Sequence, residues 1–254
     1  MPHSLFISDL HLSADQPHSM AAFLRFLAGP ARQAEALYIL GDLFEYWVGD
    51  DDSDTPFNRQ VIEALRGLSD HNTRLFLMHG NRDLLMGGEL ADACHATLLD
   101  DPALIDLYGT PTLLSHGDAL CTDDLEYQRY RAQVRDARFQ QQFLAKPLDE
   151  RKTWIAQLRK HSVAEKQYKD SAIMDVNNAA VAALLREHHY PRLIHGHTHR
   201  PARHEHTVDG HICERWVLND WHQQGSALRC DARECRTVEL PRNYAAVLIG
   251  PNSE

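Results

Sequence analysis

Three histidines stand at alternate positions in the segment RLIHGHTHRP, residues 192–201, and a glycine separates the first from the second. An imidazole is a poor choice for filling a core, because its nitrogens need polar partners when they are buried. A neutral imidazole is, however, the commonest side-chain ligand of metal ions in proteins. We therefore treat His197 and His199 as candidate ligands and assign His195, which ends the preceding apolar run, to packing.

Further oxygen and nitrogen donors follow the ends of other short apolar runs. Runs such as SLFIS, ALYIL and RLFLMH have the length and composition of buried strands. The donors at these ends are Asp9 and His11 in DLH, Asp42 in GD, Asn81 in GNRD, His116 in HGD, and His197 and His199 in GHTH. One such residue alone predicts little. Five strand ends that each carry a donor predict a common site, because ligands bind at the carboxyl edge of an α/β sheet.

The number of donors indicates how many ions the site takes. Seven side chains exceed the needs of a single ion, whereas two ions that share one carboxylate use them well. Asp42 is the natural bridge, because a carboxylate has two oxygens and its charge offsets repulsion between the cations. The mixture of oxygen and nitrogen without thiolates favours Mn²⁺, Fe²⁺ or Zn²⁺. Such a pair lowers the pKa of a bridging water and clamps a phosphoryl oxygen during in-line displacement.

Alternating strand and helix patterns position these donors. The apolar spacing predicts strands and amphipathic helices in turn through the N-terminal part of the chain, then a hairpin that ends at His116. The strands are expected at 4–8, 36–40, 74–79, 192–195, 211–220, 226–232 and 235–241, and the helices at 19–29, 57–70 and 87–94. This alternation is the signature of a layered α/β fold.

Residues 124–188 interrupt the alternation with an almost continuous helical pattern, in which Pro147 and Ser162 are expected breaks. We therefore divide the chain into a core, residues 1–123 and 189–254, and a helical insertion, residues 124–188. Insertions over the active edge of a sheet are often lids.

The composition excludes several classes of protein. With 43% hydrophobic and 24% charged residues, the chain is typical of a soluble globular protein. It has neither the pattern of a signal peptide nor an apolar run of about 20 residues that could span a bilayer. A net charge of −10 argues against general nucleic-acid binding. The five cysteines lack a C-x-x-C spacing and are expected to be reduced thiols. The acidic loop at 49–56 is expected to be solvated, since it lacks the spacing of an EF-hand.

Taken in order, DLH, GD, GNRD, HGD and GHTH resemble the motifs of the calcineurin-like dinuclear metallophosphoesterases. The resemblance spans residues 9–199 and implies a two-sheet α-β-β-α sandwich, here with a helical lid insertion. In most members of that family the third motif contains a histidine that assists the leaving group, where this chain has Arg82. The departure argues against a broad phosphomonoesterase.

Longer segments resemble one branch of the family, the UDP-2,3-diacylglucosamine hydrolases. They are ALYILGDLFEYWVGDDD, HGDALCTDD, SAIMDVN and LIHGHTHRPA, and the resemblance covers residues 4–240. It implies hydrolysis of UDP-2,3-diacylglucosamine to UMP and 2,3-diacylglucosamine 1-phosphate in lipid A biosynthesis, with two Mn²⁺ ions. It also implies peripheral association with the cytoplasmic face of the inner membrane, and we expect a monomer.

The resemblance further implies roles for individual residues. One ion is expected to be held by Asp9, His11, Asp42 and His199, and the other by Asp42, Asn81, His116 and His197. Arg82 is expected to bind the substrate phosphate bidentately, which makes the catalytic set Asp42, Asn81, Arg82 and His116. The glucosamine phosphate is expected near Asn81, Arg82 and His197, at Asp124, Ser162, Lys166 and Lys169. Asparagine is expected in relatives at the position of Lys166.

The charge of the insertion agrees with a lipid substrate. Residues 125–170 hold 11 Lys and Arg and 6 Asp and Glu, a net of +5. Basic residues there are expected to attract an anionic membrane surface, and the candidates are Arg135, Arg138, Arg151 and Lys152. Two interpretations of the apolar residues stay open, acyl-chain binding or a core of the lid itself, and these residues are Phe139, Phe143, Leu144, Trp154 and Ile155.

Two alternatives differ in function. The first is a calcineurin-like phosphodiesterase paralogue that acts on another nucleotide or phosphodiester, against which the motifs around Asp124 and Ser162 weigh. The second is a non-catalytic scaffold that kept the fold for binding. Such a scaffold would be expected to have lost metal donors, and all seven are present.

Overall fold

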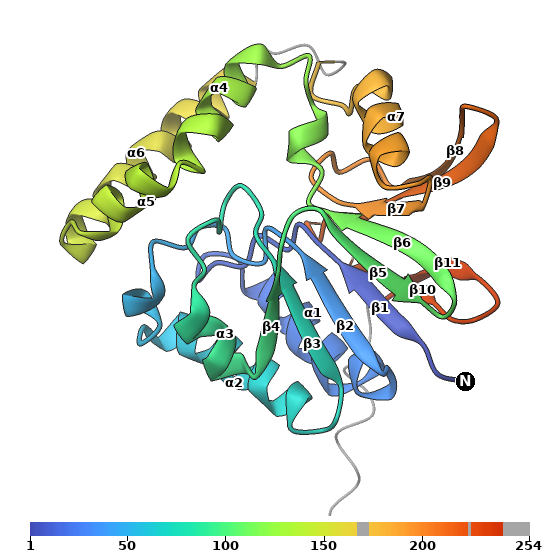
Figure 1. Cartoon of the computed structure of the whole chain (residues 1–254). Helices are drawn as coiled ribbons and strands as arrows, with labels where there is room; N and C mark the ends of the chain where they lie inside the picture. The colour runs from blue at the N-terminus through green and yellow to red at the C-terminus, as the bar shows by residue number, and fades with distance from the viewer. Residues whose placement is uncertain (167–172, 223–224, 241–254) are drawn as a thin grey trace, which may run out of the picture.

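Two β-sheets pack face to face between layers of helices in the computed structural model, which describes residues 1–166, 173–222 and 225–240 (Figure 1). The first sheet has the order β11-β10-β1-β2-β3-β4, with bounds Cys235–Glu239, Ser226–Cys230, Ser4–Ile7, Ala36–Leu40, Arg74–Met78 and Ala96–Leu99. The second has the order β5-β6-β7-β9-β8, with bounds Ala103–Leu107, Thr110–Ser115, Arg192–His195, His211–Val217 and Ala202–Val208. The expected α-β-β-α sandwich is confirmed.

Alternation of side chains along the central strands separates two hydrophobic layers. Leu5 and Ile7 of β1 face the helices outside the first sheet, whereas Phe6 points into the layer between the sheets. Phe6, Tyr38 and Phe76 stack across β1, β2 and β3, with ring centroids 4.7 and 4.5 Å apart. Because these three strands run parallel in register, their carboxyl ends meet at one edge of the sheet.

Helices cover the outer faces of both sheets. The first sheet is covered by α1 (Pro17–Ala28), α2 (Pro56–Ser69) and α3 (Gly88–Cys94). Thr55 caps α2 by accepting a hydrogen bond from the Asn58 backbone N–H, and Pro56 occupies the first turn. The second sheet is covered by α7 (Asn178–Glu187), whose Val181 and Leu185 are buried against strands β6 and β7.

The remaining helices form an arm above the carboxyl edge of the first sheet (Figure 1). They are α4 (Leu125–Val134), α5 (Ala137–Leu144) and α6 (Leu148–Lys166). The break expected at Pro147 is confirmed, because α5 ends and α6 begins around it. The break expected at Ser162 is wrong, because that residue lies inside α6. The division of the chain at residues 124 and 188 stays a proposal. Helix α7, which that division assigns to the insertion, packs against the second sheet rather than with the arm.

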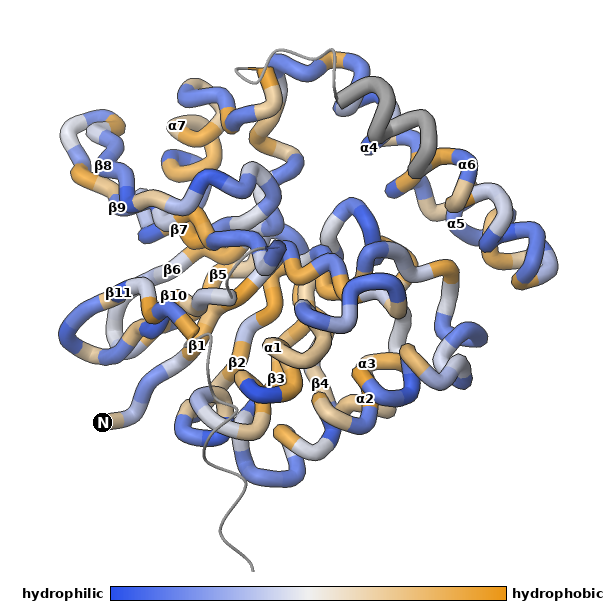
Figure 2. The backbone as a smooth tube through the Cα atoms, turned by 180° about the vertical axis from the view of Figure 1, so that it is seen from behind, coloured by the Kyte–Doolittle hydropathy of each residue, from blue (hydrophilic) through white to orange (hydrophobic). Residues whose placement is uncertain are grey.

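Three aromatic rings give the arm an apolar centre of its own. Phe143 is buried and lies 5.1 Å from Trp154 and 6.4 Å from Phe139, measured between ring centroids. Leu144, by contrast, leaves 41% of its surface exposed. Apolar stretches in the arm alternate with strongly hydrophilic ones, whereas the central strands are continuously apolar (Figure 2). The aromatic residues therefore form the hydrophobic core of the arm, which is one of the two interpretations left open by the sequence.

The structure corrects two expectations about loops and cysteines. Cys230 and Cys235 form a disulfide between the directly paired ends of β10 and β11, so the five cysteines are not all free thiols. The acidic loop is only partly solvated: Asp51 and Asp54 are exposed, whereas Asp50 accepts hydrogen bonds from the Trp47 indole and from the backbone N–H groups of Gly87 and Leu90.

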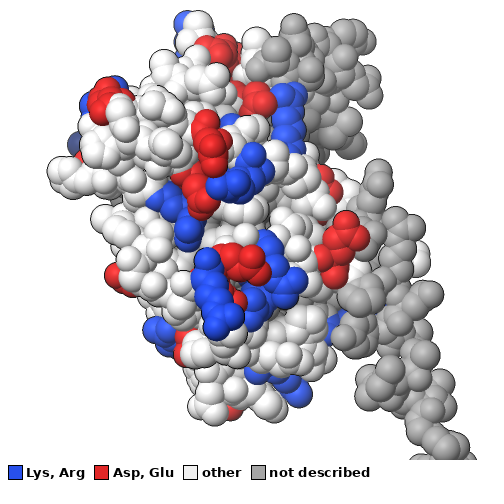
Figure 3. Space-filling model, turned by 90° about the vertical axis from the view of Figure 1, so that its right-hand side faces the viewer, with Lys and Arg blue, Asp and Glu red and all other residues white. Residues whose placement is uncertain are grey.

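Charges of both signs mix on the face that carries β8 and β9 (Figure 3). Arg203 pairs there with Glu205 and Glu214, and Glu214 also accepts from Arg192. This mixing gives no continuous basic patch on that face of the kind that nucleic acid requires. Within the part of the chain that the structure describes, no helix is long and apolar enough to cross a membrane.

Candidate metal centre

The loops that leave β1, β2, β3, β6 and β7 bring all seven predicted donors to one edge of the sheets. Five of the donors adopt positive φ angles between 49° and 69°, and they are Asp9, His11, Asp42, His197 and His199. A left-handed backbone costs a residue other than glycine about 1 kcal/mol or more. The fold holds these loops in strained conformations that turn the side chains toward a common point.

Three of the donors form the buried centre of the site. Asp9, Asp42 and His116 each offer one ligand atom, and these atoms lie within 4.8 Å of one another. The amide oxygen of Asn81 lies 3.1 Å from His116 Nε2 and 3.0 Å from His197 Nδ1. These five side chains therefore converge as the sequence predicts for a shared cation site.

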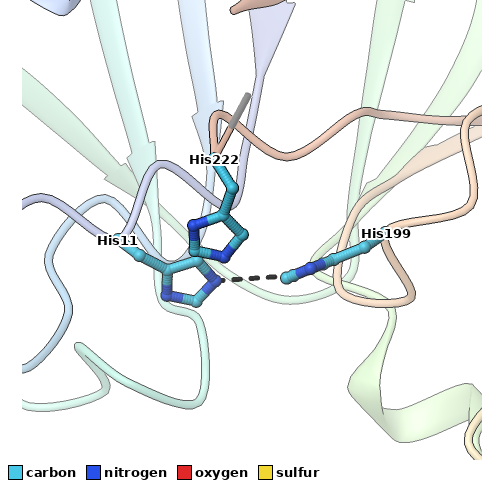
Figure 4. Close-up of side chains that lie close together, drawn as sticks. All are labelled: His11, His199 and His222. Carbon is cyan, nitrogen blue, oxygen red and sulfur yellow. Dashed lines mark hydrogen bonds between the residues drawn. The ribbon is translucent and has the colours of Figure 1, made fainter. Parts of the chain in front are cut away.

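A second group of donors adjoins the first on its solvent side. His11, His199 and His222 offer nitrogens that lie within 4.8 Å of one another (Figure 4). His11 Nε2 lies 3.4 Å from His199 Nε2 and 3.7 Å from Asp42 Oδ2, so Asp42 faces both groups. His222, which no sequence motif indicates, is exposed and stacks its ring on His11. Its position in a loop after β9, without a neighbouring glycine motif, gave no signal.

Three ligand candidates, His116, His11 and His199, each have one ring nitrogen beside a protein oxygen outside the donor set. His116 Nδ1 lies 2.9 Å from the Leu40 carbonyl oxygen, to which it can donate. His11 Nδ1 lies 3.3 Å from a Glu45 oxygen, and His199 Nδ1 lies 3.5 Å from an Asp220 oxygen. Each contact leaves the other ring nitrogen directed into the site, which is the arrangement that metal-binding histidines have in proteins.

Mutual charge shifts the titration of this cluster. Burial lowers the pKa of His116, but Asp42, Asp118 and Asp9 outweigh it and raise that pKa to about 9. Burial, together with the charge of His116, lowers the pKa of His197 to about 4. Burial raises the pKa of Asp9, but His199 beside it and the charges of His116 and His11 hold that pKa well below its usual range. The Asp9 carboxylate therefore stays ionised and attracts cations.

Asp83 fixes the loop that carries Asp42. Its buried carboxylate accepts hydrogen bonds from the backbone N–H groups of Asp42, Leu43, Phe44 and Gly80, at distances between 2.8 and 3.3 Å. Gly80 must be glycine, because a Cβ there would lie 2.0 Å from Asp42 Oδ1. The acidic residue of the GNRD motif thus positions the ligand loop.

His195 lies behind the ligand loops, and it takes no place in the site. It is completely buried, with Nδ1 2.9 Å from the Gly196 carbonyl oxygen and Nε2 3.0 Å from the Arg215 guanidinium. Burial and the charge of Arg215 lower its pKa to about 3. Both nitrogens are used inside the fold, in agreement with a packing role.

The structure describes the predicted substrate-binding residues to different extents. Arg82 is half-buried beside the site, with a guanidinium nitrogen 3.8 Å from Glu45 Oε1. Asp124 caps α4 by accepting from the Tyr127 backbone N–H at 3.0 Å. Ser162 and Lys166 lie in the last turns of α6, and Lys169 lies outside the described residues. Their contacts with substrate stay predictions.

The base of the arm is anchored beside the metal centre. Asp118, two residues after His116, is buried and accepts from Tyr127 Oη at 2.9 Å and from Arg131 Nε at 2.8 Å. The ring of Tyr127 also lies 5.6 Å from that of His197. Helix α4 is therefore tied to the loop that carries a ligand candidate.

The start of α6 is anchored to the acidic loop. Arg151 is buried, and its guanidinium donates to the Val48 carbonyl and to Asp51. Lys152 pairs with Asp52 at 2.5 Å. Arg135 is likewise engaged, because it lies 3.6 Å from Asp118 and donates to the Gly80 carbonyl. Three of the four basic residues expected to face a membrane are thus used in holding the arm to the core. Arg138 alone of the four is exposed without an ion pair among the described residues.

The donor set fits divalent cations. Asp9 Oδ1 is buried and has no hydrogen-bond partner among the described residues, although it faces His199 Nε2 at 3.3 Å. A buried carboxylate oxygen of this kind needs a compensating charge. Oxygen and imidazole nitrogen without thiolate suit Mn²⁺, Fe²⁺ or Zn²⁺.

Comparisons with known proteins agree with this geometry. The model of the calcineurin-like phosphoesterase family matches residues 3–201. A UDP-2,3-diacylglucosamine hydrolase of Aromatoleum aromaticum is 56% identical over 90% of this chain and 93% of its own length. Hydrolases of the same name from Edwardsiella ictaluri and Escherichia coli O81 are 49% and 47% identical, over 95% and 94% of this chain and 93% and 99% of their own lengths. The chain therefore belongs to the calcineurin-like phosphoesterases and, within them, to the family of UDP-2,3-diacylglucosamine hydrolases.

Proposed function

We propose that this chain hydrolyses the pyrophosphate bond of UDP-2,3-diacylglucosamine and releases UMP and 2,3-diacylglucosamine 1-phosphate. The observation that carries the proposal is the convergence of seven oxygen and nitrogen donors on one sheet edge, with Arg82 beside them. Identity of 47–56% to hydrolases of that name, over nearly the whole chain, supports the choice of substrate. The reaction would serve lipid A biosynthesis.

The site would hold two Mn²⁺ ions. The group around His11 and His199 would hold one, the group around Asn81, His116 and His197 the other, and Asp42 faces both. Bound divalent ions supply Lewis acidity and lower the pKa of a water so that it becomes a nucleophile near neutral pH. The buried Asp9 and Asp42 carboxylates favour retention of such cations, because their negative charge lies in a region shielded from water.

The residues around the ions would direct attack to the uridine-side phosphorus. Arg82 carries a planar guanidinium that matches two phosphate oxygens and stabilises charge that develops on them. Water oxygen bonds to that phosphorus, the bridging P–O bond breaks, and its electron pair stays on the sugar phosphate. A sugar phosphate is a stable anion, so the reaction needs little help from a protein acid. Arginine is therefore tolerable where other family members have histidine.

The arm would bind the lipid part of the substrate. Asp124, Ser162, Lys166 and Lys169 are proposed to contact the glucosamine phosphate. Leu144, which is exposed at the end of α5, is available to an acyl chain. The aromatic cluster around Phe143 would keep the arm rigid while the chains bind.

Peripheral association with an anionic membrane would deliver the substrate. Arg129 and Arg138 are exposed on the arm and have no ion pair among the described residues. Leu125, at the start of α4, leaves 65% of its surface exposed. Basic residues attract an anionic surface and apolar ones enter the interface, so this combination suits docking of the arm.

A parallel assay tests the proposal. The purified chain, stripped of metal and reloaded with Mn²⁺, is offered UDP-2,3-diacylglucosamine and bis-p-nitrophenyl phosphate in separate reactions. We expect metal-dependent release of UMP from the lipid substrate. Turnover of the generic diester alone would favour a paralogue with another substrate, and turnover of neither would favour a non-catalytic scaffold.

A further inference from the structure

Glu45 lies between two parts of the site that the proposed reaction uses separately. It follows Asp42 by three residues and leaves only 9% of its surface exposed. Its backbone N–H donates to the Leu12 carbonyl at 3.0 Å, and Leu12 also forms a bridge with Phe44. The loop that carries Glu45 is thus attached to the loop that carries His11, and its position is fixed by the backbone of both.

The two oxygens of Glu45 face different partners. Oε2 lies 3.3 Å from Nδ1 of His11, and Oε1 lies 3.8 Å from a guanidinium nitrogen of Arg82. His11 directs its other nitrogen toward Asp42 and the metal centre. Glu45 therefore stands behind the metal ligand on one side and beside the phosphate-binding arginine on the other.

We propose that Glu45 is a positioning residue that couples the metal ligand His11 to the phosphate clamp Arg82. The inference rests on the proposed function for the role of Arg82 and on the donor geometry alone for the role of His11. A carboxylate on the outer nitrogen fixes the plane and tautomer of the imidazole and makes the inner nitrogen a better ligand. The same negative charge restricts the guanidinium to rotamers that face the centre.

Glu45 differs from the other groups beside the metal-site histidines, because its carboxylate contacts both a histidine and Arg82. Leu40 supports His116 through a backbone carbonyl, and Asp220 lies beside His199. Neither has a contact with Arg82 among those that the structure describes. A change at Glu45 should therefore disturb metal binding and phosphate binding together, whereas a change at Asp220 should disturb the metal alone.

Mn²⁺ titration by calorimetry tests the first half of the coupling without substrate. Glu45→Gln keeps the size of the side chain and removes its charge, and it should weaken Mn²⁺ binding about 10- to 100-fold. Glu63→Gln is the matched control, because Glu63 is an exposed residue of α2 far from the donors, and it should bind Mn²⁺ as the unchanged chain does. Glu45→Asp, which keeps the charge, should recover part of the Mn²⁺ affinity. It also provides the test if the Glu45→Gln variant folds poorly.

A double-mutant cycle with bis-p-nitrophenyl phosphate tests the second half at saturating Mn²⁺. Glu45→Gln should raise KM several-fold in the otherwise unchanged chain, and should add nothing to KM in an Arg82→Ala background. Glu45→Gln should still weaken Mn²⁺ binding in the Arg82→Ala background, because that effect acts through His11 and not through Arg82. Unchanged Mn²⁺ affinity in a folded Glu45→Gln chain, or equal KM effects in both backgrounds, would overturn the coupling. Either result would leave the choice of lipid substrate untouched.

Discussion

Asp42 is the residue on which both halves of the metal centre depend. Its Oδ2 faces His11 and its Oδ1 faces His116, at 3.7 and 3.8 Å. Asp42→Asn removes the negative charge between two cations, so we expect metal content to fall for both ions and turnover to fall about a hundredfold or more. Asn81→Ala, the comparison variant, should lose mainly one ion. Near-normal turnover of Asp42→Asn at saturating Mn²⁺ would show that Asp42 is not the shared ligand.

Asp83 should matter for stability rather than for binding of substrate. Replacement by alanine leaves four backbone N–H groups without their acceptor, and each unsatisfied buried group costs about 1–3 kcal/mol. We expect Asp83→Ala to lower the free energy of unfolding by about 3 kcal/mol or more. Asp83→Asn keeps one oxygen and should lose less. Urea denaturation measures both, and a loss below about 1 kcal/mol in the alanine variant would contradict this account.

The seven donors could be predicted from sequence because each follows a strand and stands near a glycine or in a tight turn. His222 could not, because it reaches the site from a loop after β9 and only the tertiary fold brings it to His11. The roles of Glu45 and Asp83 were hidden for the same reason, since their partners come from other loops.

At the scale of elements, the contact between α6 and the acidic loop should control how the arm moves. Arg151→Gln breaks the bonds to Val48 and Asp51, while Lys146→Gln breaks only an exposed pair with Glu150 and is the matched control. We expect amide exchange in α5 and the start of α6 to become about tenfold faster in the first variant alone. KM for the lipid substrate should also rise in the Arg151→Gln variant. Equal exchange rates in the two variants would show that Arg151 does not hold the arm.

The central strands follow from the sequence, and two of the four edge strands do not. β2 and β7 have the predicted bounds, and β1, β3, β9, β10 and β11 differ from them by a few residues at their carboxyl ends. β4 and β8 were missed because they are edge strands, at which short length or polar side chains weaken the apolar pattern. The disulfide between Cys230 and Cys235 was missed because a hairpin register, rather than a spacing motif, brings the two residues together.

At the scale of the whole molecule, the proposed membrane docking depends on few charges. Because Arg135, Arg151 and Lys152 are paired with the core, Arg129 and Arg138 are the better residues to change. Each basic residue near an anionic surface contributes about 1 kcal/mol, so the double Gln variant should bind anionic vesicles up to about 30-fold more weakly.

A second double variant controls for net charge in that experiment. Arg32→Gln with Arg66→Gln removes two exposed charges from the core, remote from the arm, and should leave vesicle binding unchanged. Sedimentation with vesicles at several salt concentrations measures both variants. If the two double variants lose affinity equally, the arm has no special role in docking.

Hydrolysis in ¹⁸O-labelled water tests the central claim most directly, because it reports both which bond breaks and which phosphorus the water attacks. The Mn²⁺-loaded chain is given UDP-2,3-diacylglucosamine, and the ¹⁸O content of the two products is measured by mass spectrometry. With the ions and Arg82 gathered on the uridine-side phosphate, one ¹⁸O atom should enter UMP and none the 2,3-diacylglucosamine 1-phosphate. Label in the sugar phosphate instead would contradict the account, because it would place the attack on the other phosphorus.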